Sequence, residues 1–205
     1  MSPIKEFIES GVLELYVLGA TTPEQNLEVE QMAAAHAVVR QELDEISLSM
    51  ENYALANAVK PKETVKPLLL ASIDYIERMK KGELPAIPPV VTEESRAEEY
   101  AQWVNREDMT LPADADEIYA KIIGYTPAAI TAIVWIKKDM SEYEVHHDEN
   151  ERFLILEGTC DMIVEGEVFK LKAGDFFAVP LHARHKVKIT SEVPCKAVLQ
   201  RLSIN

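Results

Sequence analysis

The chain has 205 residues, of which 47% are hydrophobic, so it is long enough for one large domain or two small ones with a buried core. Its formal net charge is −14, and residues 1–112 carry 10 Lys and Arg against 20 Asp and Glu. Nucleic-acid backbones and anionic membranes attract Lys and Arg, so this balance argues against direct binding to either. It favours a protein partner with a basic surface, although surplus Glu would serve solubility equally well.

The sequence also bears on where the protein resides. No stretch approaches the roughly 18 apolar residues of a membrane helix, and the first residues lack the long apolar region of a secretory signal. The two cysteines, Cys160 and Cys195, form no CxxC pair and are too few for a disulfide framework. We expect a cytoplasmic protein with reduced thiols, in which each cysteine is a small buried hydrophobic residue.

Residues 1–84 are predicted to form a helical domain. Ser2-Pro3 and Thr22-Pro23 each place a capping residue before a proline, a pattern that opens helices, and Gln25 completes a capping box with Thr22. Further helices are expected from Val12 to Leu18 and roughly from Pro67 to Lys81.

The clearest periodicity in the chain follows Pro23. Eight residues are spaced alternately three and four apart: Val29, Met32, His36, Val39, Leu43, Ile46, Met50 and Tyr53. This spacing predicts a single long helix with one stripe buried against partner helices.

Residues 85–112 are predicted to connect two domains. The run Leu84-Pro85-Ala86-Ile87-Pro88-Pro89 is rich in proline and favours a stiff, extended segment. A short helix from Thr92 to Asn105 is expected to follow and to dock through Tyr100, Trp103 and Val104.

Residues 113–205 have the texture of a β domain. Short β-branched or aromatic runs alternate with turn residues such as Gly158, Gly166 and Gly174, which predicts a barrel or sandwich. The expected strands are Ile130–Lys137, Phe153–Leu156, Met162–Val164, Val168–Leu171, Phe176–Val179, Val187–Ile189 and Ala197–Leu202.

Two motifs in this region resemble those of the cupin family. His147-x3-Glu151-x6-Gly158 is similar to the first cupin motif, HxHx3Ex6G, and Gly174-x5-Pro180-x-His182-x2-His185 is similar to the second, Gx5PxGx2Hx3N. The resemblance implies a double-stranded β-helix barrel. With the helices predicted before it, the chain is expected to be an α + β protein of two domains, a helical bundle followed by this barrel.

The resemblance also implies a metal site, because metal-binding cupins hold a divalent ion with such residues. Carried over by position, the ligands are His147, Glu151 and His185, and Val145 stands where the family has its first histidine. Two His and one carboxylate can hold Zn or Fe. His182, which replaces the usual Gly, and His146 are candidate additional ligands. His146 or Glu144 would serve only if the strand bulges or has already ended, because a regular strand turns alternate residues outward. The alternative is a metal-free barrel whose polar residues bond to one another.

A second resemblance lies in the helical part. Leu15-Tyr16-Val17-Leu18-Gly19-Ala20, Pro23-Glu24, Glu42-Leu43 and a later helix with Leu68-Leu69-Leu70-Ala71-Ser72-Ile73 are similar to the N-terminal domain of anti-sigma factors. The zinc motif of that group, HxxxCxxC, is absent, since Met32, His36 and Val39 occupy its positions. The resemblance implies that the stripe binds a sigma factor of the extracytoplasmic-function group, through Met32, His36, Val39, Leu43, Ile46 and Met50.

The order of the parts favours a regulatory protein. We expect a bacterial cytoplasmic anti-sigma factor that controls transcription in a stress response, in which the cupin senses a small molecule or redox signal. Cupins often pair through their barrels, so a homodimer is the default assembly. The rival hypothesis is a metal-dependent cupin enzyme, a dioxygenase or isomerase, whose helical domain only dimerises it. A third is a metal-free cupin that carries a sugar or small acid.

Overall fold

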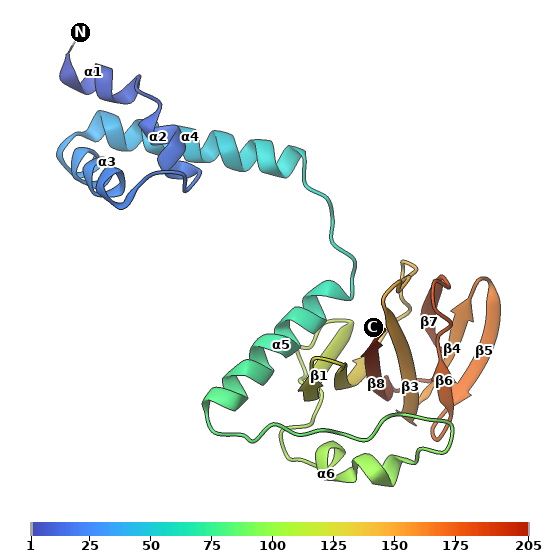
Figure 1. Cartoon of the computed structure of the whole chain (residues 1–205). Coiled ribbons are helices and arrows are strands. Elements are labelled where there is room, and N and C mark those ends of the chain that lie inside the picture. Colours follow the sequence, from blue (N-terminus) through green and yellow to red (C-terminus); the bar gives the residue numbers. More distant parts are fainter. Residues whose placement is uncertain (1, 205) are drawn as a thin grey trace. The chain divides into compact units, whose positions relative to one another are not determined.

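The structure is a computed structural model that describes residues 2–204. The chain folds as two units, Met1–Lys60 and Pro61–Asn205 (Figure 1). Each unit has its own hydrophobic core. The first unit is helical and the second is built mainly of β-strands. No helix among the described residues is both long and apolar enough to cross a membrane.

The helical unit is held together by a small apolar core. Leu13, Val29 and Val39 are fully buried at its centre, and partly buried side chains such as Phe7 and Ile46 surround them. The capping box predicted at Thr22 and Gln25 is present. The helices of this unit are α1 (Pro3–Ile8), α2 (Val12–Val17), α3 (Pro23–Ala35) and α4 (Ala37–Ala56).

The predicted long helix is two helices that meet at His36. The backbone of His36 is extended, with φ −132° and ψ 110°, and it ends α3 and begins α4. This break lets the two helices fold back on each other, so Val29 and Ala33 of α3 pack in the same core as Val39 and Leu43 of α4. Tertiary packing thus overrides a periodicity that runs on without interruption.

The stripe expected to bind a partner is mostly the internal packing face of this unit. Val39 and Leu43 are 0% and 6% exposed, and Met32 and Ile46 pack against the same core. His36 and Met50 are half-buried. In this fold Val39 and Leu43 have no surface to offer to a partner.

The second unit contains two antiparallel sheets. One has the strand order β1-β2-β8-β3-β6 and the other β5-β4-β7. Their facing sides enclose the main core, which includes Phe153, Met162, Val187 and Leu199. The strands are β1 (Ile118–Thr126), β2 (Ala129–Ile136), β3 (Glu149–Glu157), β4 (Thr159–Val164), β5 (Glu167–Lys172), β6 (Phe176–Ala178), β7 (His185–Ile189) and β8 (Cys195–Ser203).

The outer face of the five-stranded sheet is covered by the connector rather than by solvent. Tyr100 and Trp103, from the 3-10 helix η1 (Ala97–Tyr100) and from α6 (Ala101–Val104), pack on outward residues of the sheet such as Ile133 and Leu154. The connector also crosses β1 at Gly124, where a Cβ would lie 2.1 Å from Cδ of Pro88. The expected docking of the connector is confirmed, although its helix is shorter than the predicted 92–105.

The helix α5 (Val65–Lys80) belongs to the β unit and not to the helical one. It packs along β1, and Ala71 enters the main core with partly buried Leu68 and Tyr75 beside it. The helical domain expected over 1–84 therefore includes a helix that packs on the sheet, and the two units divide at residues 60 and 61.

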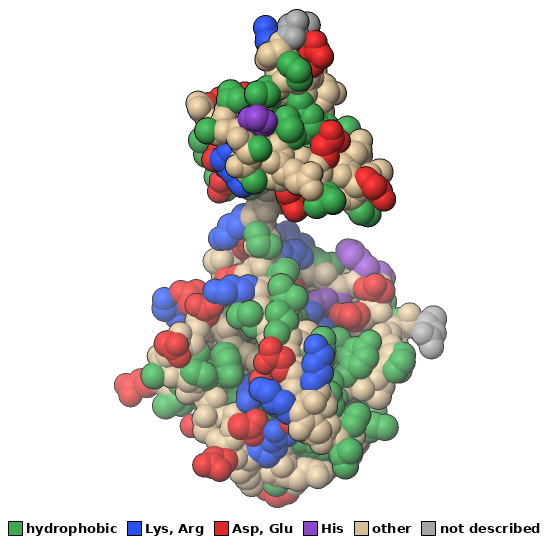
Figure 2. Space-filling model, turned by 90° about the vertical axis from the view of Figure 1, so that its left-hand side faces the viewer, with side chains coloured by type: hydrophobic (Ala, Val, Ile, Leu, Met, Phe, Trp, Pro, Cys, Tyr) green, Lys and Arg blue, Asp and Glu red, His purple; other side chains and the backbone are tan. Residues whose placement is uncertain are grey.

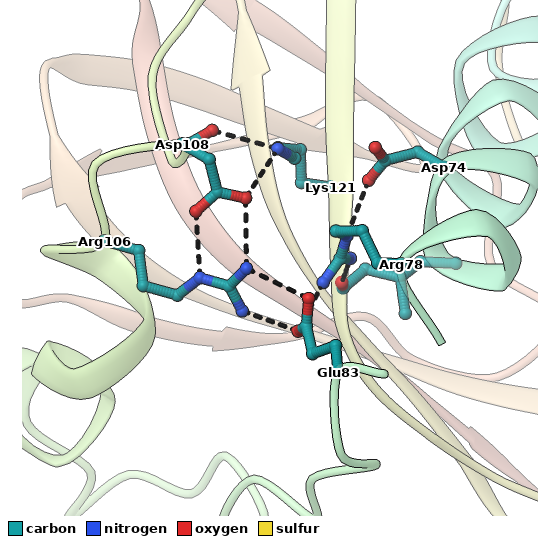
Figure 3. A network of polar contacts seen from close by, with 7 residues as sticks. Asp74, Arg78, Glu83, Arg106, Asp108 and Lys121 are labelled. Carbon is teal, nitrogen blue, oxygen red and sulfur yellow. Dashed lines mark hydrogen bonds and ion pairs between the residues drawn. The ribbon is translucent and has the colours of Figure 1, made fainter. Parts of the chain in front are cut away.

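A network of ion pairs fixes the C-terminal end of α5 (Figure 3). Arg78 of α5 bonds to Glu83, and Glu83 also bonds to Arg106 at 2.7 Å. Arg106 in turn pairs with Asp108, which receives Lys121 of β1 at 3.0 Å. The network joins α5, the connector and β1.

Candidate metal centre

Four side chains with metal-binding atoms converge inside the β unit. One ligand atom from each of Glu144, His146, Glu151 and His185 lies within 4.8 Å of those of the other three. We call this group the inner cluster. Glu151 comes from β3, His185 opens β7, and the other two come from the segment that precedes β3.

Strand geometry aims Glu151 and His185 into the core. Glu151 alternates with Phe153 and Ile155, which belong to the main core, and His185 alternates with Val187 in the same way. Glu151 and His185 are 2% and 1% exposed. A side chain with a charge is rarely buried so fully unless it is paired or holds a metal.

An isolated β-bridge brings Glu144 to His185. The amide of Glu144 donates to the carbonyl of His185 at 2.8 Å, and the amide of His185 donates to the carbonyl of Glu144 at 2.9 Å. His146 lies two residues after Glu144 and faces the same side. The centres of the His146 and His185 rings are 5.2 Å apart.

Arg201 supplies a positive charge beside the inner cluster. It stands opposite Glu151 in the register of β3 and β8, and its Nε donates to Glu151 Oε1 at 2.8 Å. Its other contacts with carboxylates are longer, at 3.9 Å to Glu149 and 3.7 Å to Glu144. Arg201 therefore neutralises part of the charge of the three carboxylates.

The side chains that face Glu151 favour its ionised form. Burial acts to raise the pKa of Glu151, but the imidazoles of His146 and His185 and the charge of Arg201 outweigh it, so the pKa lies well below its ordinary value. His185 Nε2 lies 2.9 Å from Glu151 Oε2, and its Nδ1 lies 3.2 Å from the carbonyl of Ala183. Burial acts to lower the pKa of His185, and the bond to Glu151 outweighs it and raises this pKa. With both ring nitrogens facing acceptors, the imidazolium form suits the site.

His146 carries the atom that best indicates a ligand site. Its Nε2 is buried and has no hydrogen-bond partner among the residues that the structure describes. The atom lies 3.5 Å from Glu151 Oε1, which is too long for a hydrogen bond of ordinary strength, so the interaction is electrostatic. A buried imidazole nitrogen without a partner is costly, and a metal ion at the inner cluster would satisfy it.

The residues present fit a divalent ion. Two imidazoles and two carboxylates suit Zn, Fe or Mn better than the soft metals that select thiolates. Beside the inner cluster lies a cavity of about 40 Å³, lined by both carboxylates and His185, by Arg201, and by apolar side chains such as Val134 and Leu199. The cavity therefore has room for an ion together with water.

The structure places the predicted ligands in two separate groups. Glu151 and His185 lie in the inner cluster, together with His146. His147 and His182 are exposed and pair with each other, with their Nδ1 atoms 2.9 Å apart and their ring centres 5.2 Å apart. The centre of an imidazole ring lies about 1.1 Å from its nitrogen, so these distances place the two nitrogens in line, as an N–H···N bond requires.

The position of His146 and Glu144 follows from where β3 begins. Strand alternation would turn His147 inward and His146 outward, but β3 starts only at Glu149, so residues 145–148 are free of that constraint. Glu144 and His146 share a face through the bridge to His185 instead. Arg201 was not anticipated, because its position opposite Glu151 depends on the register of β3 and β8.

Comparison with known proteins identifies the β unit. The family model described as "Cupin domain" matches residues 133–202. The C-terminal region is a cupin domain. Its two sheets and the inward-facing Glu151 and His185 agree with the cupin motifs in the sequence, whereas His147 of the first motif is exposed. We refer to Pro61–Asn205, which contains this domain, as the cupin unit.

Relatives of the cupin domain are distant or uncharacterised. An uncharacterised protein of Aquifex aeolicus is 34% identical over 79 residues, which span 38% of this chain and 64%, less than two thirds, of the relative. The Cnp3 cupin domain of Schizosaccharomyces pombe is 14% identical, with a TM-score of 0.41 over 44% of this chain and 67% of its own. An RmlC-like cupin from Shewanella frigidimarina is 21% identical, with a TM-score of 0.39 over 48% of this chain and 87% of its own.

Proposed function

We propose that this chain is a regulatory protein whose cupin unit senses a metal ion or a small reactive species at the inner cluster. The helical unit binds a protein partner, a sigma factor of the extracytoplasmic-function group. The signal changes the affinity of this binding. A divalent metal at the cluster would supply a Lewis-acidic centre, and one that takes six ligands, such as Fe²⁺, would keep two positions open to a small ligand. Glu144, His146, Glu151 and His185 would hold it.

The size of the cavity carries the sensing half of this proposal. A cavity of about 40 Å³ beside the inner cluster suits an ion, water or a small reactive species better than a large organic substrate. Substrate pockets of enzymes are larger, about 300–1,000 Å³. The same observation weighs against the rival hypothesis of a dioxygenase or isomerase.

The surface of the helical unit supports the partner-binding half. Residues 1–60 carry 3 Lys and Arg against 10 Asp and Glu. Figure 2 shows hydrophobic and acidic side chains next to one another on this unit. An acidic surface with exposed apolar anchors suits a partner that is basic and partly apolar, as a protein that binds nucleic acid is. The large exposed apolar residues are Leu15, Leu18, Leu27, Val38, Leu48, Tyr53, Leu55 and Val59.

Binding to candidate partners tests this proposal. The full chain is co-expressed with each extracytoplasmic-function sigma factor of the source genome, and complexes are separated by size-exclusion chromatography. We expect a one-to-one complex with one of them that is lost in Leu48→Asp, since Leu48 is 57% exposed on α4. Val168→Asp, at a residue 50% exposed on the cupin unit, is the matched control and should leave the complex intact. If no sigma factor of that group forms a complex with the chain, the proposed partner is refuted.

A further inference from the structure

Thr64 makes an unusual bond at the start of α5. A threonine before the first turn of a helix ordinarily accepts a bond from the second or third amide of the helix. Here the third residue is Pro67, which has no N–H, and within residues 2–204 the Thr64 side chain makes no capping bond. Its Oγ1 instead donates to Glu144 Oε1 at 2.5 Å. The Thr64 hydroxyl thus bonds to Glu144 of the inner cluster instead of capping the helix.

The residues around Thr64 make further contacts with the same loop. Glu63 accepts bonds from Ser141 Oγ and from the amide of Glu142, both at 3.2 Å. One part of the cavity wall is formed by Pro67 and Leu68 of α5 and by Thr64, which precedes the helix. Residues 63–68, which we call the lid segment, therefore cover the cavity and are bonded to the loop that carries Glu144.

The two ends of α5 are held very differently. At the C-terminal end the ion-pair network of Arg78, Glu83, Arg106 and Asp108 ties the helix to the connector (Figure 3). At the N-terminal end the amide of Leu68 reaches the carbonyl of Thr64 only at 3.4 Å, and the ion pair of Lys66 with Asp116, at 2.6 Å, joins two exposed side chains and therefore stabilises the helix little. Bond strength falls with such length, so the first turn is the weaker end of the helix.

A metal ion at the inner cluster would disturb the lid segment. The four ligand atoms are now up to 4.8 Å apart. Ligand atoms bond to Zn²⁺ at about 2.0–2.2 Å, so atoms 4.8 Å apart would have to draw closer to share one ion. Gathering the four atoms would draw the Glu144 carboxylate towards the other ligands, in competition with the bond that its Oε1 accepts from the Thr64 hydroxyl, and the ion would take up space that the lid segment borders.

We infer that residues 63–68 are a lid that is closed by the Thr64–Glu144 bond and opens when a divalent metal ion occupies the inner cluster. The inference rests on the proposed sensing function and names its first structural step. The lid segment follows residues 57–62, which are exposed and lead from the helical unit. Opening would thus free the segment through which the chain passes from the cupin unit to the helical unit, whereas the ion-pair network would keep the far end of α5 in place.

Hydrogen exchange and metal-binding kinetics on the full chain test the lid, with Zn²⁺ alone as the probe. Amide exchange of residues 61–70 is followed by mass spectrometry, and the rate of Zn²⁺ uptake is followed by competition with a fluorescent chelator. We expect Zn²⁺ to speed exchange in this segment at least severalfold. Thr64→Val should take up Zn²⁺ about tenfold faster, the order expected when one hydrogen bond to a charged group is lost. Thr190→Val, which removes a threonine bond to Thr159 elsewhere in the cupin unit, is the matched control and should leave the rate unchanged.

The outcomes separate the lid from the function on which it rests. Zn²⁺ binding without faster exchange at residues 61–70, or with the same uptake rate in Thr64→Val, would overturn the lid and leave metal sensing intact. If the wild type and Thr64→Val both fail to bind Zn²⁺, metal sensing at the inner cluster is refuted. The proposed lid is then refuted as well.

Discussion

Replacing Glu151 by Gln should destabilise the cupin unit even without metal. The substitution keeps the size of the side chain but removes the carboxylate that receives Arg201 at 2.8 Å and His185 at 2.9 Å. Glu151 is 2% exposed, so solvent cannot replace either bond. Removing one partner of a buried ion pair costs about 3–5 kcal/mol. We expect about 3 kcal/mol, the lower end of that range, because Arg201 keeps longer contacts with Glu144 and Glu149.

Tryptophan fluorescence isolates this effect, because both tryptophans of the chain, Trp103 and Trp135, lie in the cupin unit. For a unit of about 150 residues, a loss of about 3 kcal/mol lowers the melting temperature by about 9 °C. Urea unfolding of chelator-treated protein gives the free energy directly. Glu149→Gln is the control and should cost well under 1 kcal/mol, since Glu149 is partly exposed and 3.9 Å from Arg201. A loss below about 1 kcal/mol in Glu151→Gln would refute the view that its charge is held by Arg201 and His185.

Two further predictions concern the ion-pair network and the helical core. Partial burial acts to raise the pKa of Asp108, but bonds from Arg106 and Lys121 outweigh it and lower this pKa from 3.8 to about 2. The contribution of the Asp108 carboxylate to stability is therefore present above pH 3.8 and lost as the pH falls towards 2. The urea midpoints of wild type and Asp108→Asn should differ at pH 6 and converge near pH 2. A difference that stays constant with pH would contradict this. Leu43→Ala should cost the helical unit about 3 kcal/mol and reduce the helical circular dichroism while leaving the tryptophan transition unchanged. Leu48→Ala, at an exposed position of the same helix, should change neither signal, and an equal loss there would show that the core is not where we place it.

The β part of the fold follows closely from the sequence. All seven expected strands are present, because β-branched runs separated by Gly158, Gly166 and Gly174 leave few alternatives. The strand β1 was not expected. It contains Gly124 and a register shift between Ile122 and Gly124, so its apolar alternation is broken where the connector crosses it. The need for that glycine depends on Pro88, which is distant in the sequence.

The helical part and the site were less predictable, because they too depend on contacts that local sequence patterns do not reveal. No Pro or Gly marks the break at His36 in the sequence, because the break arises from the packing of α3 on α4. In the site, Glu151 and His185 sit on strands whose alternation can be derived. His146 and Glu144 precede β3, where neither alternation nor spacing determines direction. Thr64 reaches the cluster from a helix 80 residues away in the sequence, which a local pattern cannot reveal.

Counting bound metal tests the central claim of a sensing site at the inner cluster most directly. The full chain and two variants, His146→Ala and His147→Ala, are dialysed against Zn²⁺ and then against buffer, and metal per chain is measured by mass spectrometry. Loss of a ligand should weaken binding by about 100-fold or more. We predict one ion per chain for the wild type and for His147→Ala, and a large loss for His146→Ala. Retention of the ion in His146→Ala with its loss in His147→Ala, or the absence of bound metal in all three proteins, would contradict the account.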